Sequence, residues 1–109
     1  NYGDSVEFEA EYLNQISDEK ILIRMLRNLK NSYIDSFAYD MAIICNQMIL
    51  GAIPDSVDEI RDGGILEEKM GNYDNAEKLL NKYLEMDPNA EDVDFVLELI
   101  KEIRNKVNQ

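Results

Sequence analysis

The sequence contains no histidine, a single cysteine and only two prolines among its 109 residues. Without histidine, a serine or cysteine nucleophile would lack the imidazole that usually activates it, which argues against a stand-alone hydrolase or transferase. One cysteine cannot form a disulfide within the chain, and this suits a reducing compartment. Two prolines and five glycines are too few for an all-β domain with its many turns.

Basic residues are also scarce, with 11 Lys and Arg against 23 Asp and Glu and a net charge of -12. This balance repels nucleic-acid backbones and anionic membrane surfaces, so we expect neither as a partner. The longest apolar runs, such as residues 41–45, are far too short to cross a bilayer. Residues 1–17 carry acids and no apolar signal region. We therefore expect a cytoplasmic protein.

Hydrophobic residues make up 45% and charged residues 31% of the chain, which is the composition of a globular domain. The chain resembles itself when it is shifted by 34 residues. The coincidences are Tyr39 with Tyr73, Asp40 with Asp74, Ala42 with Ala76, Leu50 with Leu84 and Pro54 with Pro88. A period of 34 residues is typical of tetratricopeptide repeat (TPR) units, each a pair of antiparallel helices.

The repeated residues have physical roles that follow from their positions. A small alanine, Ala42 or Ala76, lets the second helix of each pair approach the first closely, so both should be buried. The proline closes each unit because it cannot continue a helix. Gly64 falls inside a predicted helix, where glycine costs about 1 kcal/mol, and close helix packing is its expected use.

Periodicity and capping residues predict five helices, over residues 18–34, 37–50, 55–70, 73–86 and 90–107. Ser17 or Asp18 should cap the first and Asn89 the last, while Gly51 and Gly71 should end the second and third. The expected fold is all-α, a right-handed antiparallel array of TPR type. Repeat 1 covers about 21–54, repeat 2 about 55–88 and a capping helix about 90–107, within a domain of residues 18–109. Residues 1–17 are expected to be a linker or a short extra helix.

The last predicted helix has an apolar side that should cover the second hairpin, because a repeat array needs a cap with one polar face. The apolar residues are Val93, Val96, Leu97, Ile100, Ile103 and Val107. A dimer seam is the alternative use of this side.

The run Gly71–Ala76 with Leu80, Tyr83 and Pro88 is a TPR signature. Two longer segments resemble one particular family. Residues 21–33 (ILIRMLRNLKNSY) and 59–89 resemble the helical region of the SirB-type family, over roughly residues 12–104. That bacterial family has a transglutaminase-like domain followed by C-terminal TPR repeats. The resemblance implies a helical C-terminal half without the catalytic domain, so no catalytic residue is carried over.

The sequence departs from the TPR and SirB-type patterns at two places. Phe37 stands where a TPR hairpin often has glycine, and Gly63 stands where the SirB-type family often has arginine. These departures affect local helix geometry rather than the fold.

The first predicted helix has a basic stripe. Lys20, Arg24, Arg27 and Asn31 are spaced i, i+4, i+7 and i+11, which places them on one side of a helix. Leu22, Met25, Leu26, Leu29 and Tyr33 fall on the opposite, core-facing side. The stripe therefore points away from the core in a strongly acidic chain.

The TPR resemblance implies that the first helix of each pair lines a concave groove. Arg27 and Asn31 then occupy positions where carboxylate-binding TPR domains place a lysine and an asparagine, and Arg61 is the equivalent of Arg27 in repeat 2. The predicted partner-binding residues are Arg24, Arg27, Asn28, Asn31 and Arg61. Asp62 and Val96 replace two further clamp residues, so the full clamp is missing. The alternatives are a solvated face with intrachain ion pairs, a surface for an acidic partner or upstream domain, and a carboxylate clamp.

These features favour a non-catalytic module that binds an acidic protein or peptide, or else a helical half that docks or regulates an upstream transglutaminase-like domain. No catalytic residue, cofactor or metal site is expected. Cys45 should be buried and inert. The acidic run of residues 87–98 lacks the glycine that a calcium loop needs at its sixth position, where Asp92 stands.

Overall fold

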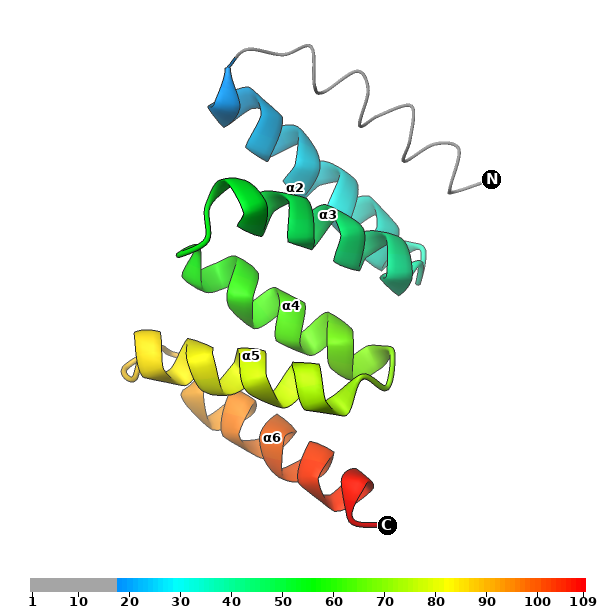
Figure 1. The fold of residues 1–109 in the computed structure, drawn as a ribbon, viewed down its shortest axis with the longest axis vertical. Coiled ribbons are helices and arrows are strands. Elements are labelled where there is room, and N and C mark those ends of the chain that lie inside the picture. Colours follow the sequence, from blue (N-terminus) through cyan, green and yellow to red (C-terminus); the bar gives the residue numbers. More distant parts are fainter. Residues whose placement is uncertain (1–17) are drawn as a thin grey trace. The chain divides into compact units, whose positions relative to one another are not determined.

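A computed structural model describes residues 18–109, and every regular element in that range is a helix (Figure 1). The helices are α2 (Glu19–Asp35), α3 (Tyr39–Ala52), α4 (Val57–Lys69), α5 (Tyr73–Met86) and α6 (Val93–Val107). The all-α fold class and the five predicted helices are confirmed. The expected linker or extra helix over residues 1–17 lies outside the described residues. The chain divides into two compact units, Asn1–Ala52 and Ile53–Gln109, called here the first and second units.

The first unit contains the antiparallel pair α2 and α3 (Figure 1). Asp18 caps α2, because its carboxylate accepts a hydrogen bond of 2.9 Å from the backbone N–H of Lys20. Ile23, Leu26 and Ile49 form the centre of the core. Ala42 is completely buried, as the repeat register predicts, so the two helices pack closely at this position.

The turn between α2 and α3 corrects one predicted boundary. Phe37 has a φ of 61°, a left-handed conformation that cannot belong to a right-handed helix. The second helix therefore begins at Tyr39 rather than at residue 37. It also continues through Gly51 to Ala52, so this glycine does not end it. Glycine lowers helix stability without forbidding the conformation.

The second unit contains α4, α5 and α6. A Cβ atom added to Gly64 would lie 2.7 Å from Cδ2 of Leu80 and 3.4 Å from the carbonyl oxygen of Ala76. Both Ala76 and Leu80 are fully buried. The predicted use of Gly64 in close helix packing is confirmed, and it acts together with Ala76. Gly71, with a φ of 78°, follows the end of α4 as expected.

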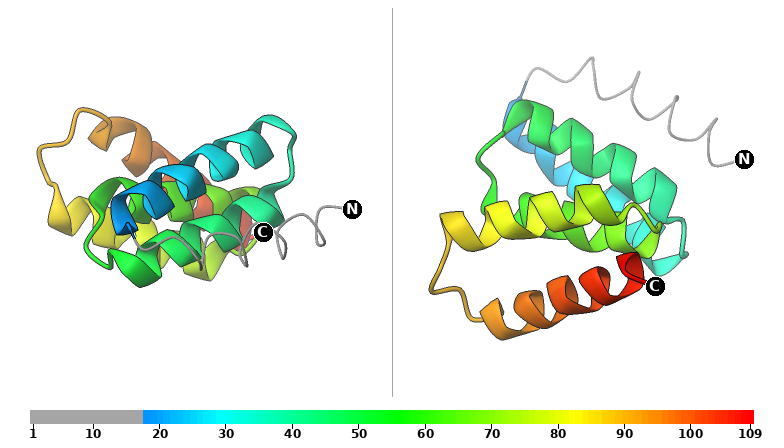
Figure 2. Two further views of the ribbon diagram at one scale, coloured as in Figure 1. Left: turned by 90° about the horizontal axis from the view of Figure 1, so that it is seen from above. Right: turned by 60° about the horizontal axis from the view of Figure 1, so that its bottom comes forward.

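Helix α6 packs alongside α5 (Figure 2). It begins at Val93 with Asp92 at the N-cap position, so the predicted start at residue 90 and the cap at Asn89 are wrong. Residues 87–92 are turns instead: the N–H of Ala90 bonds the carbonyl of Asp87, and the N–H of Val93 bonds the carbonyl of Ala90. Because these turn hydrogen bonds occupy residues 87–92, α6 begins three residues later than predicted.

The buried side of α6 is narrower than its apolar pattern predicts. Its buried residues are Val96, Leu99, Ile100 and Ile103. Leu97 and Val107 are 50% and 56% exposed, which corrects their predicted core position. Leu97 lies one residue further round the helix than Val96, and Val107 is its last residue. Between residues 18 and 109, no helix is long and apolar enough to cross a membrane.

Candidate partner-binding surface

The predicted basic stripe lies on α2, in the first unit. Lys20, Arg24, Arg27 and Asn31 are all exposed, whereas Ile23, Leu26 and Tyr33 of the same helix are buried. Asn28 is exposed as well. On the predicted core face, Leu22 and Met25 are half-buried and pack against the core, and Leu29 is half-buried. The side chains that sequence reasoning assigned to the surface of this helix are therefore all exposed.

The stripe has an unusual charge environment along the chain. Residues 20–34 contain four bases and no acid, although the chain has 23 acids in all. The fourth base, Lys30, is buried and does not belong to the surface. An exposed arginine presents a planar fork that can hold a carboxylate through two parallel hydrogen bonds. Lys20, Arg24 and Arg27 thus form a cationic patch suited to carboxylates.

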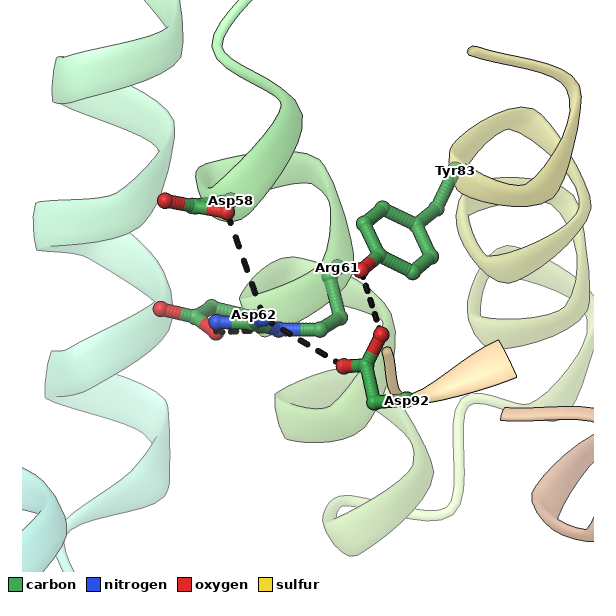
Figure 3. Close-up of polar contacts among 5 residues, drawn as sticks. All are labelled: Asp58, Arg61, Asp62, Tyr83 and Asp92. Atoms are coloured by element: carbon green, nitrogen blue, oxygen red, sulfur yellow. Dashed lines mark hydrogen bonds and ion pairs between the residues drawn. The ribbon is translucent and has the colours of Figure 1, made fainter. Parts of the chain in front are cut away.

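Arg61 lies in a different setting, on α4 of the second unit, where its side chain is 28% exposed. Its Nε and Nη2 atoms lie 3.2 and 3.0 Å from one carboxylate oxygen of Asp62. Its Nη1 atom lies 3.3 Å from Asp92 and 4.0 Å from Asp58. Figure 3 shows the guanidinium between these acids. Arg61 therefore neutralises nearby acids, and part of its side chain remains exposed to solvent.

Tyr83 completes the group around Arg61 (Figure 3). Its buried hydroxyl donates a hydrogen bond to Asp92, and the Arg61 guanidinium carbon lies 5.8 Å from the centre of its ring. The hydrogen bond to Asp92, together with burial, raises the pKa of Tyr83. Arg61 and Asp92 thus join α4 and α5 to the start of α6. Sequence reasoning missed Asp92 because it lies 31 residues from Arg61 and outside the repeat register.

Two opposing effects act on the pKa of Arg61. Burial alone lowers it, but the hydrogen bond to Asp62 and the negative charges of Asp62 and Asp92 raise it further, so the net shift is upward. The guanidinium therefore remains a cation at any physiological pH.

The structure places the five predicted binding residues in two separate units. Arg24, Arg27, Asn28 and Asn31 belong to the first unit and Arg61 belongs to the second. Within the first unit the four residues share α2. A single groove that includes Arg61 stays a prediction.

Cys45 lies on α3 of the first unit. Cys45 is buried, and burial raises the pKa of its thiol to about 11, against a smaller lowering by the charge of Lys30. Few thiolates are present at neutral pH, so this cysteine is a poor nucleophile. Among residues 18–109, no three His, Cys, Asp or Glu side chains gather closely enough to hold a metal ion.

Comparison with known proteins gives two results. The tetratricopeptide repeat family matches residues 29–101. Two proteins named "UPF0162 protein", from two strains of Xylella fastidiosa, are each 31% identical to the chain over 97 residues. The match covers 89% of this chain and 34% of each relative, so the chain spans about a third of the length of the curated relatives it matches.

Proposed function

This chain belongs to the tetratricopeptide repeat family, and we propose that it is a non-catalytic module that binds an acidic peptide or domain of another protein. Repeat arrays of this kind present extended surfaces to protein partners. The proposed binding residues are Arg24, Arg27, Asn28, Asn31 and Arg61. We place the interaction in the cytoplasm, whose reducing conditions suit a chain with one cysteine.

The observation that carries the proposal is the exposed cationic patch on α2. Lys20, Arg24 and Arg27 are exposed on one side of the helix, in the stretch of the chain that contains no acid. Asn28 and Asn31 add amide groups that can donate and accept hydrogen bonds beside these charges. Carboxylates of a partner would match this combination of cations and donors.

The strength of binding depends on how far the contacts are shielded from water. A desolvated, charge-assisted hydrogen bond contributes about 1.5–3 kcal/mol, whereas an exposed ion pair contributes about 0–1 kcal/mol. Salt screens exposed pairs strongly. We therefore expect binding that weakens as the ionic strength rises.

Arg61 has a secondary role in this proposal. Its guanidinium already contacts Asp62 and Asp92, so only its exposed edge is offered to a partner. Its removal would also disturb the second unit. A test of binding therefore begins with the residues on α2.

The experiment compares two charge-reversed variants with the unchanged chain. One carries Arg24→Glu and Arg27→Glu, and the matched control carries Lys78→Glu and Lys82→Glu, two exposed bases of α5. A partner identified by affinity purification is titrated against each by calorimetry. We expect the α2 variant to bind at least tenfold more weakly at an unchanged melting temperature, and the control to bind normally. Equal binding by both variants would refute the proposal.

The second candidate is a helical half of a SirB-type protein that docks or regulates an upstream transglutaminase-like domain. Two observations favour it: the resemblance of residues 21–33 and 59–89 to that family, and the chain's coverage of only 34% of its relatives. The test is to express this chain together with the remaining part of a full-length relative as a separate polypeptide. Co-purification that is lost on reversal of Arg24 and Arg27 supports docking. Independent elution excludes it.

A further inference from the structure

The apolar residues of α6 divide into two sets. One set faces the core of the second unit: Val96, Leu99, Ile100 and Ile103. Leu97 and Val107 stay exposed, at 50% and 56%. Both belong to a row along one side of the helix, with alternating spacings of four and three residues, called here the α6 seam: Val93, Leu97, Ile100, Arg104 and Val107. Two helices pack along a row of this spacing in a coiled coil.

The α6 seam lies on a helix that is held on both sides. Arg104 forms an ion pair with Glu77 of α5, and the ammonium of Lys106 lies 3.5 Å from a carboxylate oxygen of Glu68 of α4. Together with the buried residues of α6, these contacts connect it to both other helices of the second unit. A surface that is already ordered loses little conformational freedom when it binds a partner. The seam therefore presents its exposed residues in fixed positions.

Two opposite charges, Asp94 and Lys101, lie beside the seam. Both are exposed, and they are seven residues apart, which is about two helical turns, so they share one side of α6. Asp94 has no base within four residues along the chain, and its neighbour four residues on is Glu98. Like charges at this spacing destabilise a helix. A base from another molecule would therefore be attracted to the start of this helix.

We propose that the α6 seam binds the same seam of a second copy, so that the chain forms a two-fold symmetric dimer with antiparallel α6 helices. In this arrangement Leu97 of one copy packs against Ile100 of the second copy. Val93 packs against the aliphatic part of the Arg104 side chain, and Val107 lies opposite the start of the other α6. The surface belongs to the second unit, so the dimer goes beyond the proposed function and does not depend on the α2 patch.

The charges beside the seam select a second copy and fix its direction. When Leu97 faces Ile100 of an antiparallel copy, Asp94 and the Lys101 of that copy lie within about 3 Å of each other along the helix axis, at 1.5 Å per residue. The two-fold axis repeats this ion pair, because the same surface supplies both partners. A parallel pair would instead place Asp94 against Asp94 and Lys101 against Lys101. Like-charge repulsion therefore disfavours the parallel arrangement.

The size of the contact sets its expected strength. Each copy contributes one helix of 15 residues, which is at the small end of specific interfaces, so we expect a Kd of the order of 100 μM. The net charge of -12 makes two copies repel each other at long range. In 0.15 M NaCl this repulsion is screened beyond about 8 Å, whereas an ion pair that the dimer partly buries is screened less. The measurements therefore use this salt concentration.

The first test is sedimentation equilibrium of the full chain from about 10 μM to about 1 mM. The average mass should rise from that of one chain towards that of two, and a monomer throughout this range would overturn the proposal. Leu97→Glu should weaken the dimer at least tenfold, because it places a charge in the seam. The matched control is Phe95→Glu, which adds the same charge at an exposed residue of α6 outside the seam, and it should dimerise normally. Equal dimerisation of the two variants would also overturn the proposal.

The second test examines the direction of the helices by charge reversal. Asp94→Lys and Lys101→Glu should each weaken the dimer about fivefold, because each places like charges opposite one another. An equimolar mixture of the two variants should regain the affinity of the unchanged chain, since every Asp94–Lys101 contact between the two variants again joins opposite charges. Lys82→Glu on α5, an exposed base, is the control and should have no effect. A mixture that dimerises no better than either variant alone would contradict the antiparallel seam.

Discussion

The first and second units contain the same helical hairpin but distribute their charges differently. Residues 18–52 hold four bases and four acids, whereas residues 53–109 hold seven bases and fifteen acids. In the second unit several bases pair with acids of other helices, as Arg61 does with Asp92 and Arg104 with Glu77. In the first unit the bases gather on α2, three of them exposed. The same helical hairpin thus carries ion pairs between distant residues in the second unit and exposed bases on α2 in the first.

The turns of the two hairpins show a second difference. Phe37 and Gly71 are 34 residues apart, and both have left-handed backbones, with φ of 61° and 78°. Glycine adopts this conformation without strain, whereas a bulky residue pays about 1–2 kcal/mol. Phe37 is also 77% exposed, with an edge-on contact to Tyr39 at 6.2 Å between ring centres. The repeat therefore preserves a backbone conformation even where the residue disfavours it.

The largest expected effect comes from overpacking the second hairpin. Ala76→Leu places three more carbon atoms at a fully buried position that also faces Gly64, so we expect a loss of roughly 1–3 kcal/mol in the free energy of unfolding. Ala42→Leu in the first hairpin is the matched change. Chemical denaturation measures both, and a neutral result for Ala76→Leu would disprove the packing role of this alanine.

Arg27 and Arg61 lie one repeat apart, and their removal should lower the free energy of unfolding by different amounts. Arg61→Ala removes a partly buried cation from Asp62 and Asp92 and should cost about 1–2 kcal/mol, after allowance for its partial exposure. Arg27→Ala changes an exposed side chain and should change the free energy of unfolding by no more than about 0.5 kcal/mol. Thermal unfolding compares the two variants. Equal melting temperatures would show that the Arg61 contacts add nothing to stability.

The turn residues should respond in opposite directions. Phe37→Gly relieves the left-handed strain and should raise stability by about 0.5 kcal/mol, after allowance for the flexibility that glycine adds to the unfolded chain. Gly71→Ala introduces the strain and should lower stability by about 1 kcal/mol. Urea titrations of both variants test the pair. A loss of stability in Phe37→Gly would mean that the aromatic ring supports the turn.

The smallest expected effect is the loss of stability that accompanies ionisation of the Cys45 thiol in the first unit. It does not occur at neutral pH. Burial raises the pKa of its thiol from the usual 9.0 to about 11, so the folded state favours the protonated form. Its contribution to stability is complete below pH 9 and is lost as the pH rises through about 11. Over that range the melting temperature should fall more steeply in the unchanged chain than in Cys45→Ala. Parallel curves would show that the thiol titrates equally in both states.

The repeat register made much of the second hairpin predictable. Helix α5 occupies the predicted residues 73–86, because a tyrosine near its start and a proline after its end define its limits. The burial of Ala76 followed from the same register, and the close approach at Gly64 followed from the presence of a glycine inside a predicted helix. The exposed stripe of α2 was also predicted, since helical spacing alone places Arg24 and Arg27 on one side.

Sequence by itself determined the helix content, the 34-residue period and the charge separation at the start of the chain, because these depend on spacing and composition. Only the structure showed where α6 begins, because local turn hydrogen bonds occupy residues 87–93. It alone decided the setting of Arg61, because Asp92 lies 31 residues away and reaches the guanidinium only through the packing of the second unit. Contacts between distant residues depend on how helices pack, and local periodicity carries no information about that.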